Sequence, residues 1–300
     1  MLYLLISVLL NVWLFLSFRS FPRFGINTLP AVAFNYLVCV VTGLLYQGRW
    51  DMFGRIEWGA SYTLFALPMG ILFILAFYLG AITSQRMGIS VSSVASKMSM
   101  VLPMLFSIFV MRIPTAEFSP FNYAGMALAL FAVLLTAAKK DVEESPDNKP
   151  HPILYLLPAA VFITGGTVDI TINYSNFRFI TPENEDYYPL IVFCAAGITG
   201  VMMLLILRIR PTLRDLVGGI YLGVPNYFSL IATFKALDAY ENNGALFYPV
   251  FNICIILGST LASVLLFRER LRNLNLLGLL LAVFALVMLS HQALEDYISF

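Results

Sequence analysis

The sequence predicts an all-α membrane protein in which ten transmembrane helices form two inverted five-helix repeats. Ten apolar stretches, each close to 20 residues long, follow one another with little between them. A bilayer core of ~30 Å requires ~20 apolar residues per spanning helix, and lipid offers the backbone no hydrogen-bond partners. Hydrophobic residues make up 60% of the chain and charged residues 12%. Because a soluble domain carries about 25% charged residues, this chain cannot cover a water-facing surface.

Each apolar stretch is expected to form one helix. The predicted spans are 2–18, 29–47, 59–83, 88–111, 121–138, 152–174, 187–207, 215–238, 244–267 and 274–291. Four prolines fall inside these spans, namely Pro68, Pro103, Pro225 and Pro249. Each removes a backbone donor and is expected to kink its helix. The pairs Gly219/Gly223 and Gly258/Ala262 have the small-xxx-small spacing that allows close helix contact.

A polar, proline-containing segment at 139–151 divides the chain into two halves. We expect a first repeat over 1–140, a linker over 141–151 and a second repeat over 152–300. An offset of 156 residues aligns Gly88 with Gly244, and after a gap an offset of 153 aligns Gly125 with Gly278 and Ala132 with Ala285. An odd number of helices per half makes the repeats inverted, which is the usual construction of secondary transporters.

The distribution of lysine and arginine predicts the orientation. Loops after the odd-numbered spans hold twelve of these residues and the opposite loops hold four. The positive-inside rule then puts the linker in the cytoplasm and both termini outside. The N-terminus lacks the basic region and cleavage site of a signal peptide, so we expect a retained first helix. Short loops favour a bacterial inner membrane.

The sequence lacks the residues that several other classes of protein require for their function. A net charge of +1 gives no nucleic-acid footprint, and no phosphate-binding loop motif occurs. The three cysteines lie in apolar stretches and both histidines at helix ends, so neither a metal site, a cofactor nor a nucleophile–His–acid set is expected. The acidic loop Glu183, Glu185 and Asp186 is the best candidate for a membrane transferase, but it has no partner set.

Two ionisable residues inside predicted spans are the main functional lead. Lys97 lies well inside the fourth span and Asp169 lies near the end of the sixth. An unpaired charge at the bilayer centre costs at least ~2.5–3.5 kcal/mol, so such residues face a cavity or a partner. Our hypothesis is that both face a central cavity and pair directly or through substrate. The alternatives are a static ion pair and snorkelling to the interface.

Polar residues recur at helical spacing in at least five spans, which favours a polar lumen. Together with the two charges they give the candidate substrate-binding residues, which are Lys97, Asp169, Ser93, Asn173, Asn226, Tyr248, Asn252, Asn11 and Asn35. The alternative is that these groups hold helices together, at about 0.6 kcal/mol per hydrogen bond.

The segment Ser263–Arg272, which reads SVLLFRERLR, is followed by Gly278 and an apolar helix. This pattern resembles a signature of the drug/metabolite transporter (DMT) superfamily in its EamA-like branch, with Glu269 at the acidic position. Ile113 departs from the pattern at the equivalent place in the first half, whereas Gly88–Met98 resembles the fourth helix of the family. The resemblance implies ten helices around a central cavity. It also implies termini in the cytoplasm, against the charge count.

The sequence therefore predicts a secondary transporter, or permease, for a small organic metabolite or drug. It would be an exporter or exchanger working by alternating access, and coupling to protons is the weaker part of this prediction. Glu269 is expected to be structural. A flippase for lipids or lipid-linked sugars is the main alternative, and a receptor or a membrane-embedded enzyme ranks lower. The expected partners are the substrate, the bilayer and protons, without nucleic acid, and a homodimer is left open.

Overall fold

A computed structural model describes residues 2–48, 50–106, 109–110, 119–137, 156–179, 188–239 and 244–291. Within these ranges every regular element is helical. The elements are α1 (Leu2–Ser20), η1 (Phe21–Phe24), α2 (Thr28–Gln47), α3 (Met52–Arg55), α4 (Ser61–Met87), α5 (Ile89–Met98), α6 (Val101–Phe106), α7 (Pro120–Ala137), α8 (Leu157–Arg178), α9 (Tyr188–Ile206), α10 (Leu213–Asp238), α11 (Gly244–Phe267) and α12 (Asn273–Leu289).

Six helical segments in the described ranges are long and apolar enough to cross a membrane. They are Leu2–Phe24, Thr28–Gln47, Ser61–Met87, Tyr188–Ile206, Leu213–Ala236 and Phe247–Phe267. Three further predicted spans correspond to shorter apolar helices, namely Pro120–Thr136, Leu157–Ile172 and Asn273–Leu289. The fourth predicted span is the pair α5 and α6. Six helices of the described ranges thus have the length and composition needed to span a membrane.

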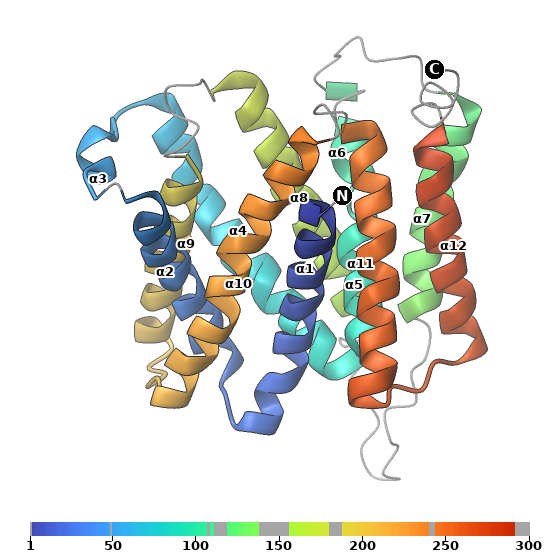
Figure 1. The fold of residues 1–300 in the computed structure, drawn as a ribbon, viewed down its shortest axis with the longest axis horizontal. Coiled ribbons are helices and arrows are strands. Elements are labelled where there is room, and N and C mark those ends of the chain that lie inside the picture. The colour runs from blue at the N-terminus through green and yellow to red at the C-terminus, as the bar shows by residue number, and fades with distance from the viewer. Residues whose placement is uncertain are drawn as a thin grey trace.

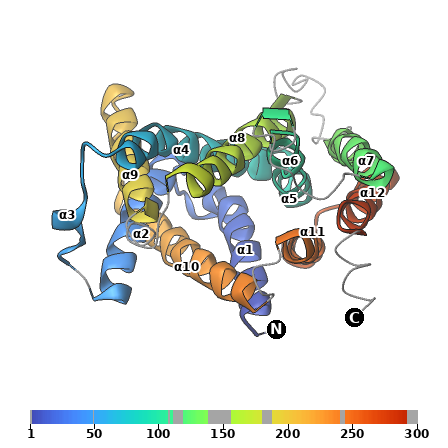
Figure 2. The same cartoon turned by 90° about the horizontal axis from the view of Figure 1, so that it is seen from above.

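The long helices run side by side in one bundle (Figure 1). Helices α7 and α12 pack together at one edge, and α2 and α9 pack together at the other. Seen from above, α5 lies between α8 and α11 and contacts both (Figure 2). The end of α1, the start of α10 and the end of α11 meet at one end of the bundle. There the Arg23 guanidinium lies 4.4 Å from the ring centre of Phe267.

Pro103 accompanies a break in the fourth span, a stronger effect than the predicted kink. The helix stops at Met98 and restarts at Val101, leaving a turn at Ser99 and Met100. Pro103 has no N–H to donate to the carbonyl of Ser99 four residues earlier, and its ring crowds that carbonyl. Leu102 N instead donates to Ser99 O at 2.9 Å in a tighter turn. In contrast, α4, α10 and α11 each continue across their internal proline.

Small residues allow helices to approach closely where the sequence predicted it. A Cβ atom at Gly223 of α10 would lie 2.6 Å from the carbonyl oxygen of Asn35 in α2, and Gly219 lies directly against Phe34 of the same helix. Gly70 lets α4 approach the backbone of Ala195 in α9 in the same way. Without a hydrophobic driving force in lipid, such close packing is what holds helices together.

Candidate functional site

The structure brings Lys97 of α5 and Asp169 of α8 into the same interior part of the bundle, where these two helices pack together. Their charges interact electrostatically, but no nitrogen–oxygen contact within 4 Å joins them. Both side chains are partly exposed rather than sealed in the core. The Lys97 ammonium makes no hydrogen bond to any described residue and lies 5.6 Å from the ring centre of Phe251 in α11. Both charged groups therefore retain unused hydrogen-bonding capacity.

The helix break beside Lys97 supplies the polar part of this region. Ser99 Oγ lies 3.4 Å from Asp169 Oδ2, but it lies only 2.6 Å from the carbonyl oxygen of Ser96. A hydroxyl has one proton, and the nearer carbonyl takes it, so Ser99 satisfies Asp169 poorly. Asn252 of α11 donates its amide to the Met100 sulfur at 3.3 Å. A thioether is a weak acceptor, so this amide can change partner readily.

Aromatic side chains of α11 form the remaining wall. Phe247 and Phe251 are stacked, with ring centres 5.2 Å apart and an interplanar angle of 16°. Tyr248 is 42% exposed, and its hydroxyl interacts electrostatically with Asp169. Gly166 of α8 lies directly against Leu102, so α8 closely approaches the segment after the helix break. We call the region formed by Lys97, Ser99, Asp169, Phe251 and Asn252, with Tyr248 and Phe247 behind it, the central site.

Other predicted site residues lie between helices, outside the central site. Asn226 of α10 donates to Asn35 Oδ1 at 3.2 Å, and it also lies 3.5 Å from the Cys39 sulfur. Asn11 donates to the Ser7 carbonyl of its own helix, and Ser93 likewise donates to the Ser90 carbonyl. The Asn226–Asn35 bond favours the interpretation that these two residues hold helices together, whereas the printed bonds of Asn11 and Ser93 lie within their own helices. The side chain of Asn173, the linker and the acidic loop lie outside the described residues.

A second polar cluster occupies the arginine-bearing end of the bundle. Glu269, whose side chain is 2% exposed, accepts hydrogen bonds from Ile89 N at 3.0 Å and from Ser90 Oγ at 3.4 Å. Ile89 is the first residue of α5, so the carboxylate caps this helix where an anion is favoured. The Arg19 Nε atom lies 3.9 Å from Glu269 Oε1, and its guanidinium also donates to the carbonyls of Ser84 and Gln85.

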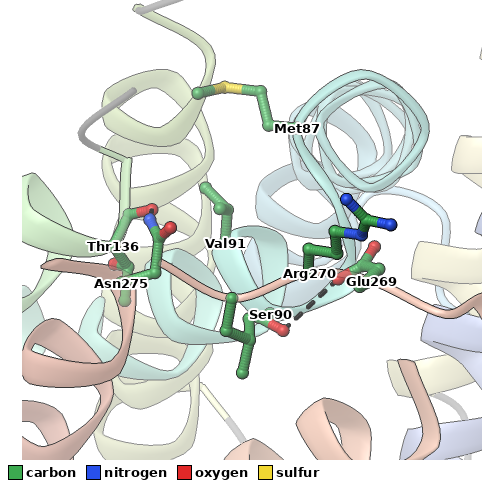
Figure 3. A pocket seen from close by; sticks show the side chains of 8 residues that line it. Met87, Ser90, Val91, Thr136, Glu269, Arg270 and Asn275 are labelled. Atoms are coloured by element: carbon green, nitrogen blue, oxygen red, sulfur yellow. Dashed lines mark hydrogen bonds between the residues drawn. The ribbon is translucent and has the colours of Figure 1, made fainter. Parts of the chain in front are cut away.

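Ser90 and Glu269 of this cluster line a shallow pocket that is open to solvent. Figure 3 shows the Ser90 hydroxyl directed at Glu269, with Thr136 and Asn275 on the other side of the pocket. The Asn275 amide donates to the Thr136 carbonyl at 2.7 Å. The Glu269 carboxylate already receives two donors from α5 and lies beside Arg19 of α1, so it has little capacity left for a cation or a polar ligand. We refer to Arg19, Gln85, Ile89, Ser90 and Glu269 as the end cluster.

The described residues hold no group of three or more His, Cys, Asp or Glu side chains that could bind a metal ion. The free cysteines Cys39, Cys194 and Cys254 lie on different helices, and Cys39 is fully buried. The sequence did not single out Ser99 or Phe251. Ser99 is off the Ser90/Ser93/Lys97 stripe, and Phe251 is one of 25 phenylalanines. The only available signal was the position of Pro103, four residues beyond Ser99.

No protein-family model matches the chain. An uncharacterized protein of Haemophilus influenzae is 24% identical over 291 residues, which cover 94% of this chain and 95% of that protein. A solved protein, described only as the crystal structure of a protein, has a TM-score of 0.56 and 14% identity, with 94% of this chain and 95% of that one covered. The fold therefore occurs in a protein of known structure. At these identities the likeness extends to the fold alone.

Proposed function

We propose that the protein is a secondary transporter that moves a small organic solute across a membrane, with the solute bound at the central site. The observation that carries this proposal is the placement of Lys97 and Asp169, which interact electrostatically beside a broken helix without a nitrogen–oxygen contact within 4 Å. Charges inside an apolar bundle are costly and mark substrate pathways. Binding sites of secondary transporters are commonly built at such discontinuous helices.

A reciprocal pair of helix contacts supports the proposal. A Cβ atom at Gly125 of α7 would lie 3.1 Å from the Ala285 carbonyl oxygen of α12, and one at Gly278 of α12 would lie 3.0 Å from the Ala132 carbonyl oxygen of α7. The 153-residue offset seen in the sequence converts each of these contacts into the other. This reciprocity is what a two-fold axis between α7 and α12 would produce.

Other helix contacts follow the same relation. If α1 to α7 hold the first five spans and α8 to α12 the second five, the α1–α10 contact corresponds to α4–α8, and the α2–α10 contact corresponds to α4–α9. All four of these contacts are present. The α2–α9 and α5–α11 contacts each map onto themselves. We propose on this basis that ten spans form two inverted five-helix repeats, as in the EamA-like branch of the drug/metabolite transporter superfamily.

The departures from symmetry suggest which end of the pathway is closed. Helix α4 packs against α1 and α5, while the corresponding contacts of α10 with α8 and α11 are at most marginal in the described part of the chain. The contacts of α4 with α1 and α5 lie partly in the end cluster, where Arg19 reaches the end of α4 and Glu269 caps α5. We therefore propose that this conformation is closed at the end cluster and looser at the opposite end. Rocking of the repeats would reverse this arrangement.

The positive-inside rule assigns the end cluster to the cytoplasmic side, because the arginine-bearing loops gather there. A relative in Haemophilus influenzae supports placement in a bacterial inner membrane. In this orientation the protein would work as an exporter or exchanger whose conformation here is closed to the cytoplasm, with protons as a candidate coupling ion. A reporter fused to Phe300 tests the orientation, since activity of the reporter in the cytoplasm would reverse it.

The direct test is a thermal-shift screen of the purified protein against a metabolite library, with Lys97→Ala in parallel. A ligand at 100 times its Kd adds about 2.7 kcal/mol of stability. We expect at least one soluble metabolite to stabilise the protein and to lose this effect in the variant. If lipids alone stabilise it, the flippase alternative replaces this proposal. If the hits are unchanged by Lys97→Ala, the central site is not where they bind.

A further inference from the structure

The central site presents one positive and one negative group that no nitrogen–oxygen contact within 4 Å joins. Resting on the transport function proposed above, we infer that the solute is a zwitterion, with its anionic group bound by Lys97, its cationic group bound by Asp169 and an apolar part against Phe251. The inference deepens that proposal by naming the class of solute. It depends on three features of the site, which are its charge balance, its unused hydrogen-bonding groups and its aromatic wall.

The charge balance selects against solutes with a single charge. Lys97 and Asp169 together carry no net charge, and the described residues add no third ionised side chain to the central site. A bound anion or cation would leave one uncompensated charge inside an apolar bundle, where its solvation is lost. A zwitterion satisfies both protein charges and adds none. It also exchanges a weak interaction over more than 4 Å for two direct contacts.

The hydrogen-bonding groups match the same chemistry. Lys97 offers three N–H donors that no described residue accepts, which suits a carboxylate with two oxygens. The Asn252 amide is held only by the Met100 sulfur and can turn to the same carboxylate. Asp169 accepts one long contact from a Ser99 hydroxyl that has a nearer partner, which leaves its oxygens available to an ammonium. An uncharged solute would leave both ionised groups poorly paired.

The aromatic wall gives the solute its apolar requirement. Phe251 is 5% exposed and stacked on the fully buried Phe247, so its ring is held in place. Its face carries the Lys97 ammonium at 5.6 Å. A carboxylate that draws the ammonium away would uncover part of this face for an apolar group of the solute. The half-exposed Tyr248 lies three residues before Phe251 in α11 and can adjust to solutes of different size.

The test uses the purified full-length protein and two matched sets of probes. The first set is L-phenylalanine, 2-phenylethylamine, which lacks the carboxylate, and 3-phenylpropionate, which lacks the amine. The second set is L-leucine, isopentylamine and 4-methylpentanoate. We expect a zwitterion of at least one set to bind the protein at least about tenfold more tightly than either of its singly charged relatives, as the loss of one charged contact predicts. Binding is measured by ligand-dependent thermal shift.

Two variants make the prediction sharper. Asp169→Asn should bind the anionic relative better than the zwitterion, and Lys97→Met should prefer the cationic relative. Lys235→Met is the matched control, because Lys235 is exposed on α10, which contributes no residue to the central site, and its ammonium lies over Tyr3 of α1. Size-exclusion profiles establish that the variants remain folded.

The outcomes separate the two proposals. Equal binding of a zwitterion and its singly charged relatives, or variants that weaken all probes alike, would overturn the zwitterion inference and leave the transporter proposal intact. The same holds if none of the probes binds while other metabolites in the library stabilise the protein in a Lys97-dependent way. If no soluble metabolite binds at all, both proposals fail.

Discussion

Replacing Glu269 with alanine is expected to destabilise the protein and to open the end cluster. The buried carboxylate accepts from Ile89 N at 3.0 Å and from Ser90 Oγ at 3.4 Å, and it lies 3.9 Å from Arg19 Nε. Alanine leaves the first N–H of α5 and a buried hydroxyl without this acceptor. It also removes the counter-charge of a guanidinium that keeps its bonds to the carbonyls of Ser84 and Gln85.

The magnitude follows from these contacts. Loss of a helix cap costs about 0.5–2 kcal/mol, and a hydrogen bond to a charged group contributes about 1.5–3 kcal/mol. The Arg19 contact is long and the arginine side chain is 28% exposed, so it adds little. We expect Glu269→Ala to cost about 2–4 kcal/mol, and Glu269→Gln, which keeps one acceptor, to cost about half as much. The corresponding decrease in Tm for alanine is roughly 3–6 °C for a chain of this length.

Two measurements check this prediction. Thermal unfolding in detergent should give the order wild type, Glu269→Gln, Glu269→Ala, with the exposed Glu57→Ala as control. The second is thiol labelling of Val91→Cys, which lines the pocket beside Glu269 and is 5% exposed, after the native cysteines are replaced. If the variant lowers the free-energy difference that favours the closed conformation by 1.4 kcal/mol, labelling of the cysteine should be about tenfold faster. A lower Tm with unchanged labelling would refute the closing role and leave Glu269 a purely structural cap.

Three further predictions concern the backbone and the helix contacts. Gly88 joins α4 to α5 at a φ of +101°, a backbone conformation that residues with a side chain rarely adopt. Gly88→Ala should therefore lower the free energy of unfolding by about 1–3 kcal/mol, measured by thermal unfolding. Gly80→Ala is the control and should have no measurable cost, because the space beside Gly80 is open. Gly278→Val should separate α7 from α12 and lower the Tm by several degrees, because even a Cβ there would lie 2.6 Å from Thr136 N. Pro103→Ala should let α5 and α6 join into one helix, which would move the residues of the central site apart. Binding of the best thermal-shift ligand should weaken at least about tenfold, without a lower Tm of the free protein. Unchanged binding would count against a role of the helix break.

The sequence was sufficient to predict the helices because lipid leaves the backbone no alternative. Every predicted span corresponds to a described helix or, in the fourth span, to the pair α5 and α6. Pro103 predicted a kink, but not that the helix would stop at Met98, since Pro68, Pro225 and Pro249 have the same local signal in continuous helices. Whether a proline kinks or breaks a helix depends on the groups that satisfy the freed carbonyl.

The sequence was sufficient to identify the two charged residues of the central site, but not the partners that each polar residue contacts. The cost of burying Lys97 and Asp169 indicated that they face a cavity or a partner, and the structure does bring them to one region. The stripe pattern could not distinguish a lumen from a helix contact, because Asn35 and Asn226 satisfy each other across two helices far apart in sequence. For the same reason the capping of α5 by Glu269, 180 residues away, has no local signal.

Solute counterflow in proteoliposomes tests the central claim most directly. Vesicles are loaded with the unlabelled solute that stabilises the protein most strongly in the thermal-shift screen, and entry of the labelled solute is followed. If the binding site is at Lys97 and Asp169, the wild type should transiently accumulate the labelled solute. The initial rate of labelled-solute entry in Lys97→Met and Asp169→Asn should be less than about a tenth of the wild-type rate. Absence of counterflow in the wild type would contradict the transport function. Full rates in both variants would contradict the central site.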